Sequence, residues 1–396
     1  MVFSRLGINS TNDKILASLS FVIFMPMLFD FIASLASGST SNITMIIYGI
    51  SLIFIFVIGR QRIKFRNIIP LLFVYFICLL NITLFPESQQ YFGIAQYLIL
   101  LYFLPIGFIV FRTIKSWDNF IPILFLFTPF AIIMGIYVLI FAHLAESEDT
   151  FTYMEFSYAL LPFVCASYAY YNIKKHIVGL LLYFIGLIEM LSFGCRGAVI
   201  SAIVLAISMT ILNSKRNKWN LVFLFSLILL VAINISSIIS YLSGLSLFED
   251  SYVLNRAINE TVFDVGAREH IYSNCVKRLS SMGGEISGLF GDRPYCGSVY
   301  PHNIVYEILM QWGWILGALL LLYFASLFIK AFTHNATSRF ITLYFICAIL
   351  LRFFVSGSYL TSGLFWIMIA CIQSLSNKKH TNPKEIAEPL NVNHFS

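Results

Sequence analysis

Long apolar runs separated by short polar breaks make up most of the chain. The runs are roughly 17 to 25 residues long, which is the length that a helix needs to cross the hydrocarbon core of a bilayer. They are typical of helices, because membrane strands would give short alternating segments. We therefore predict about twelve membrane-spanning helices. They lie near residues 15–36, 44–59, 67–85, 91–111, 119–142, 155–172, 177–193, 197–213, 219–241, 303–329, 338–355 and 357–376.

A single long polar segment, from Glu249 to His302, interrupts this pattern. It divides the predicted spans into nine and three, so we expect helices 1–9 within residues 1–241, a large loop at 242–302 and helices 10–12 within residues 303–376. The polar residues 377–396 are expected to form a disordered tail. The first apolar run has no small-residue cleavage site after it, so we interpret it as a retained span.

Lysine and arginine alternate between the polar breaks, as the positive-inside rule requires of short cytoplasmic loops. They follow the second, fourth, sixth and eighth runs, flank the break near 330–339 and recur in the tail. The breaks at 38–44, 86–90 and 146–149 contain none. This alternation predicts that both termini are cytoplasmic and that the loop at 242–302 faces outward.

Composition agrees with a membrane protein and excludes a soluble globular one. The 396 residues are 59% hydrophobic and 11% charged, and the mean hydropathy is +0.84, far from a soluble balance. The formal net charge of +6 is spread over the inward breaks, where it orients the chain, so it does not predict nucleic-acid binding.

Positive charge on the outward side needs a separate explanation. Arginines at positions 196, 268, 278, 293 and 352 all lie in or near the predicted outer surface. They could be solvated residues paired with Glu269, Glu285 or Asp292. An arginine facing apolar surroundings, however, costs about 2.5 kcal/mol or more. The alternative is an anionic ligand, because guanidinium donates two hydrogen bonds to phosphate oxygens.

Two short patterns contain further candidates. Small residues flank Arg196 in Ser192–Ala198, which would let the chain turn tightly between two helices, although a plain hairpin has the same pattern. Glycines and prolines from Gly288 to Pro301 precede His302 and Asn303 at the start of the tenth span. No ligand spacing predicts a metal site. Cys275 and Cys296 could form a disulfide in an oxidising compartment, or they could be free buried thiols.

These patterns resemble the O-antigen ligase and polymerase superfamily over roughly residues 190–370. Gly194-Cys195-Arg196-Gly197-Ala198 is similar to its arginine–glycine motif, with Cys195 where serine is commoner. Gly266-Ala267-Arg268 with Tyr272 resembles its loop arginine and following aromatic residue. His302-Asn303, with Gly313 and Gly317 downstream, resembles its His-Asn helix entry. The ending Ser356–Leu360 with Phe365-Trp366 looks more like the repeat-unit (Wzy-type) polymerases than the ligases.

The resemblance implies an all-α polytopic protein of the bacterial inner membrane whose large loop is periplasmic. It also implies a metal-independent and cofactor-free glycosyltransferase, with a glycan on a polyprenyl pyrophosphate as donor and a second lipid-linked repeat unit as acceptor. A chain-length regulator is a further implied partner. Arg196 and Arg268 would stabilise the leaving pyrophosphate, and His302 would be the general base, since imidazole ionises near neutral pH. Glu269, Glu285 and Asp292 are substitute bases. The substrate-binding candidates are Arg352, Arg278, Arg293, Tyr272 and Asn303.

Three other functions stay open. A ligase would transfer the same glycan to lipid A core. A lipid-linked oligosaccharide flippase would also have about twelve helices, but it should carry charges at mid-membrane and show two similar halves. The third alternative is a non-catalytic scaffold of an envelope complex.

Overall fold

The computed structural model describes residues 10–35, 41–141, 153–193, 195–213, 268–296 and 300–376. All regular secondary structure in these ranges is helical, which confirms the all-α class. Seven described helices are long and apolar enough to cross a membrane, so the chain is a multi-pass membrane protein. The predicted ninth span, residues 242–267 and the tail 377–396 lie outside the described residues. The total of about twelve spans therefore stays a prediction.

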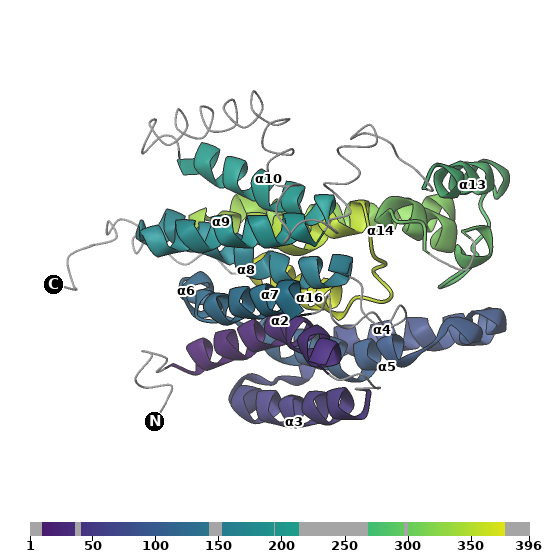
Figure 1. Ribbon diagram of the computed structural model, residues 1–396. Helices are drawn as coiled ribbons and strands as arrows, with labels where there is room; N and C mark the ends of the chain where they lie inside the picture. Colours follow the sequence, from purple (N-terminus) through teal and green to yellow (C-terminus); the bar gives the residue numbers. More distant parts are fainter. Residues whose placement is uncertain are drawn as a thin grey trace.

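Helices occupy eleven of the predicted apolar runs, and one further helix lies in the polar segment (Figure 1). The α-helices are α2 (Thr11–Leu35), α3 (Ser41–Gly59), α4 (Phe65–Leu84), α5 (Ile94–Leu98), α6 (Phe120–Phe125), α7 (Thr128–Phe141), α8 (Tyr153–Lys174), α9 (Ile177–Ser192), α10 (Arg196–Asn213), α13 (Arg268–Ser281), α14 (Ile304–His334), α15 (Ala336–Phe345) and α16 (Gly363–Ser376). Short helical turns extend or connect them: η1 (Arg60–Arg62), η2 (Pro86–Tyr91), η3 (Ile99–Phe103), η4 (Ile106–Val110), η5 (Phe111–Thr113), η8 (Arg293–Tyr295), η9 (Ile346–Leu350) and η10 (Leu351–Phe354).

Helix α8 lies inside the bundle, where it packs against α2, α6, α7, α9 and α10. It is not among the seven helices selected by length and hydropathy. Its polar groups find partners inside the protein: the Tyr168 hydroxyl lies 2.6 Å from Thr210 Oγ1, and Ser157 Oγ donates to the Met190 carbonyl at 3.3 Å. A helix surrounded by other helices does not need an apolar surface for lipid. The weak hydropathy of the run at 155–172 follows from this position.

The basic loops gather at one end of the bundle. The Asn12 carboxamide oxygen accepts from Arg62 Nη1 at 3.1 Å and from the Lys115 amide at 2.9 Å, and Thr337 donates to Asp118 at 3.2 Å. These contacts join the start of α2 to the breaks after α3, η5 and α14. Helix α13 lies at the other end of the bundle, away from the N-terminus (Figure 1). The loop that follows α13 packs Gly288 against Phe85, next to η2. This grouping agrees with the predicted alternation, whereas the membrane side stays a prediction.

Helix α14 is broken at Gly313, whose φ of 71° and ψ of 174° lie outside the helical region. The break frees the Gln311 carbonyl, which accepts hydrogen bonds from the amides of Ser287 at 3.1 Å and Gly288 at 2.9 Å. A Cβ atom at Gly313 would lie 2.7 Å from the Glu285 carbonyl oxygen. The loop 283–296 therefore docks into the break, and only glycine fits there.

Gly313→Ala should lower the stability of the protein by about 2 kcal/mol or more, because it adds a side chain in a glycine-only backbone region and against a carbonyl. Gly49→Ala is the matched control, since a Cβ atom there meets nothing within 4 Å. Thermal unfolding of the purified protein in detergent should show a lower Tm for the first variant alone. Equal Tm values for the two variants would contradict this role of Gly313.

Candidate functional site

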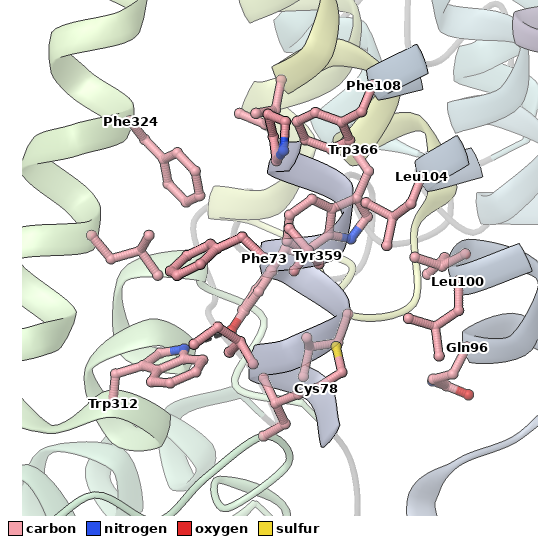
Figure 2. A pocket seen from close by; sticks show the side chains of 18 of the residues that line it. Phe73, Cys78, Gln96, Leu100, Leu104, Phe108, Trp312, Phe324, Tyr359 and Trp366 are labelled. Carbon is pink, nitrogen blue, oxygen red and sulfur yellow. Dashed lines mark hydrogen bonds between the residues drawn. The ribbon is translucent and has the colours of Figure 1, made fainter. Parts of the chain in front are cut away.

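An apolar groove of ≈ 670 Å³ lies between α4, α5 with its extension η3–η4, α14 and α16. In Figure 2, Trp312 and Phe324 of α14 lie on one side of it and Gln96, Leu100 and Leu104 on the other. Phe73 of α4 and Leu319 of α14 line the groove and are also 63% and 58% exposed. Exposed apolar side chains on membrane helices face lipid, so the groove is open to the bilayer between α4 and α14.

A buried hydrogen-bond network closes one end of the groove. The indole of Trp312 donates to the Tyr359 hydroxyl at 3.2 Å, and that hydroxyl donates to Gln311 Oε1 at 2.5 Å. Gln311 Nε2 in turn donates to Asp292 Oδ1 at 2.5 Å. Trp312 and Tyr359 line the groove, while Gln311 and Asp292 are fully buried behind them. Three successive hydrogen bonds thus connect a side chain that lines the groove to a carboxyl group of the loop.

A second buried carboxyl group, Glu307, lies in the same cluster. It accepts a hydrogen bond from the Ser358 hydroxyl and one from the Tyr359 amide at 3.4 Å. Arg293 Nε lies 3.9 Å from Asp292 Oδ2. Burial raises the pKa of Asp292 above its ordinary value, whereas the Gln311 hydrogen bond and the Arg293 charge oppose that rise. Two buried carboxyl groups therefore share one nearby guanidinium, which favours a proton on one of them.

His302 lies beside this cluster, in the left-handed backbone region at a φ of 57°. Its ring lies 4.4 Å from that of Tyr300, and the Arg293 guanidinium lies 5.5 Å from the same tyrosine ring. His302 is half-buried, unlike the buried Asp292 and Glu307. Of these three ionisable groups it is therefore the most exposed.

Asn303, predicted as a substrate ligand, caps α14 in the structure. Its side-chain oxygen accepts from the Val305 amide at 2.9 Å, which satisfies one of the free amides at the start of a helix. Tyr272, another substrate candidate, packs against Tyr306, with ring centroids 5.9 Å apart. Both residues connect elements around the start of α14.

Arg196 and Arg352 both lie near Tyr158. Arg196 is the first residue of α10, and a Cβ atom at the next residue, Gly197, would meet the Tyr158 hydroxyl and Val355. The Arg352 guanidinium lies over the Tyr158 ring, 4.6 Å from its centroid. Arg352 lies within η10, and the turn that follows η10 reaches the Glu307 cluster through Ser358. This turn therefore connects the region of Arg196 and Arg352 to the buried carboxyl group of Glu307.

Arg278 and Arg268 belong to α13. Arg278 Nη2 contacts Glu285 Oε2 at 3.3 Å and Ser287 Oγ at 3.2 Å, and its guanidinium lies 4.7 Å from the Tyr295 ring centroid. It lines a smaller hollow of ≈ 300 Å³ that shares Leu289 and Phe290 with the groove. The Arg268 side chain lies outside the described residues, so its place in the predicted site stays a prediction.

Arg293 and His302 both lie beside the Tyr300 ring. Arg196 and Arg352 lie near Tyr158, in a separate group, and Arg278 pairs with its own loop. The predicted site residues do not include Glu307, Gln311, Ser358 and Tyr359, although Ser358 and Tyr359 fall within the ending that resembles the polymerases. The signal for the first two was present, because polar residues four positions apart at the start of a membrane helix favour a functional or paired role. The signal for the turn was absent, since its partner lies about fifty residues away.

Within the described ranges, no group of three or more His, Cys, Asp or Glu side chains could hold a metal ion. The two buried carboxyl groups are instead engaged by side-chain and backbone donors. The chemistry that these residues offer is acid–base and electrostatic.

Comparison of the chain with models of protein families, with curated proteins and with solved structures gives no match. The resemblance described from the sequence therefore rests on the sequence motifs alone.

Proposed function

We propose that the chain is a polymerase of surface glycans. It transfers a glycan from polyprenyl pyrophosphate to a lipid-linked repeat unit at the periplasmic face of the bacterial inner membrane, with twelve spans and the loop 242–302 outside. The observation that carries this proposal is the continuity of one site. Trp312 and Tyr359 line an apolar groove, and hydrogen bonds through Gln311 connect them to Asp292, which is paired with Arg293. A substrate with a long apolar tail and a charged head has this distribution of polarity.

The proposed reaction assigns a role to each group. The acceptor hydroxyl oxygen bonds to the anomeric carbon of the donor glycan, and the bond from that carbon to the pyrophosphate oxygen breaks. His302 takes the hydroxyl proton, and the polyprenyl pyrophosphate leaves with the electron pair. Arg196 and Arg268 stabilise the charge on that leaving group, because fixed donors act most strongly where water is excluded.

Arg293, Arg352 and Arg278 have supporting roles in this proposal. Arg293 is buried between Asp292 and the Tyr300 ring, which suits an arginine that sets the electrostatic potential beside His302. Arg352 lies over Tyr158 on the side of Arg196. Arg278 lines the smaller hollow at the outer end, where the sugar units of a bound glycan would extend.

Deleting the protein from its host and separating the surface glycan on a gel tests the proposed class. Loss of a polymerase leaves a single repeat unit on lipid A core. A missing ligase leaves no glycan on the core, and a missing flippase leaves repeat units trapped on the cytosolic face. A wild-type glycan ladder in the deletion strain would contradict all three.

Leu319→Trp should reduce transfer several-fold, because the larger side chain enters the groove where the polyprenyl tail is proposed to lie. Leu322→Trp is the matched control on the same helix: Leu322 is 65% exposed but does not line the groove. Photo-crosslinking with a polyprenyl probe should label the control like the wild type and the Leu319→Trp protein more weakly. Equal labelling of both variants would place the tail elsewhere.

A further inference from the structure

Cys275 of α13 and Cys296, which directly follows η8, form a pair inside a small separate core. Their sulfur atoms lie 3.6 Å apart. Both thiols are buried, at 0% and 3% exposure, among Leu279, Met282, Leu309 and Met310. This core joins α13 to the first turns of α14, next to the break at Gly313.

The environment of the pair favours a covalent bond. A disulfide requires about 2 Å between the sulfur atoms, so a closure of about 1.5 Å would form it, within reach of side-chain rotation. The hydrogen bond between the two thiols lowers the pKa of Cys275 below its ordinary value and raises that of Cys296.

We infer that Cys275 and Cys296 are joined by a disulfide in the mature protein. This inference rests on the outward orientation of the loop in the proposed function, because the periplasm is oxidising. One thiolate of the pair attacks a disulfide of a thiol oxidoreductase of that compartment, and the other then displaces the oxidoreductase. One sulfur–sulfur bond forms in the chain and one breaks in the oxidoreductase, which takes up the two electrons and two protons as a dithiol.

The bond would hold the two ends of the loop segment that supplies the carboxyl cluster. Asp292 and Arg293 lie immediately before Cys296, and Asp292 bonds Gln311 on α14. Tying Cys296 to α13 keeps this turn seated, because α13 is itself attached to α14 through the hydrogen bond from Trp314 Nε1 to the Leu279 carbonyl at 3.0 Å. The other five cysteines are also described, and no contact joins any of them to a second sulfur atom within hydrogen-bonding distance.

Counting thiols in the full-length protein tests the inference. Membranes are denatured with N-ethylmaleimide to block every free thiol, then reduced and labelled with a polyethylene glycol maleimide that shifts the band on a gel. The wild type should gain two labels after reduction. Cys275→Ala and Cys296→Ala should gain none, and Cys78→Ala, which changes a cysteine of the groove, should still gain two.

A wild-type protein that gains no label would overturn the disulfide, as would two labels that persist in Cys275→Ala. Treating the intact membranes with diamide before blocking then separates the reasons for a wild type without labels. Rapid formation of the disulfide between Cys275 and Cys296 would mean that the thiols meet but face a reducing compartment, which also contradicts the proposed topology. No formation would refute the contact alone, and the gel test of the deletion strain would decide the function independently.

Discussion

The His302→Asn protein should remain folded and transfer glycan about 100-fold more slowly or worse, the effect expected for removing a general base. Asparagine adopts the left-handed backbone region more readily than most residues, so the φ of 57° at this position can be kept. The substitution removes the titratable imidazole and keeps a polar side chain. The initial rate of polyprenyl pyrophosphate release by purified protein in lipid is the measurement.

Two controls accompany this variant. His302→Ala should lose activity as well, and it tests the polar side chain, because alanine keeps the Cβ atom of histidine in this backbone region but has no hydrogen-bonding group. His176→Asn changes an exposed histidine at the N-cap of α9 and should leave the rate unchanged. A His302→Asn protein with the wild-type rate would assign the proton transfer to another group.

Arg196→Ala and Arg268→Ala should each reduce transfer by about 10²- to 10³-fold, the range measured when one donor to a developing negative charge is removed. The proteins should still purify as folded monodisperse particles, because both residues lie at the first position of a helix. The effect should fall mainly on kcat, since the pyrophosphate charge grows in the transition state.

Arg339→Ala is the matched control for these variants. Arg339 is exposed at the opposite end of the bundle, where its guanidinium lies over the Phe332 ring. Its removal should change neither kcat nor KM. Full activity in both the Arg196→Ala and Arg268→Ala proteins would overturn the assignment of these arginines to the leaving group.

Much of the helical architecture is predictable from hydropathy, since each described apolar run is a helix. Two apolar runs differ from the predicted helices, and each difference has a local physical cause. The run at 357–376 becomes a helix only from Gly363, because the preceding turn binds Glu307 through Ser358 and the Tyr359 amide. The run at 119–142 is two helices, α6 and α7, and Pro129 follows the first residue of the second, a position where proline is tolerated.

The break at Gly313 shows a different limit. An apolar period tells which residues face lipid, but it does not reveal a positive φ inside a helix. The reason for that φ is the loop 283–296, whose amides bind the Gln311 carbonyl. A contact between a loop and a helix some twenty-five residues apart leaves no periodic trace in either segment.

Parts of the candidate site were open to prediction and parts were not. Asn303 before Ile304 is a preferred helix cap, so its structural role could have been weighed beside the substrate role. The pairing of Asp292 with Gln311, and of Glu307 with Ser358, depends on how three elements meet. Such tertiary pairs have no spacing rule, so the sequence does not predict them.

Metal-independent polymerisation can be measured with the purified full-length protein in lipid vesicles. The substrate is a synthetic polyprenyl pyrophosphate-linked repeat unit, and the buffer contains EDTA. If the protein is the proposed polymerase, we expect a ladder of lengthening glycans and one released polyprenyl pyrophosphate for each glycosidic bond formed. Unchanged substrate, or pyrophosphate release without longer glycans, would contradict it.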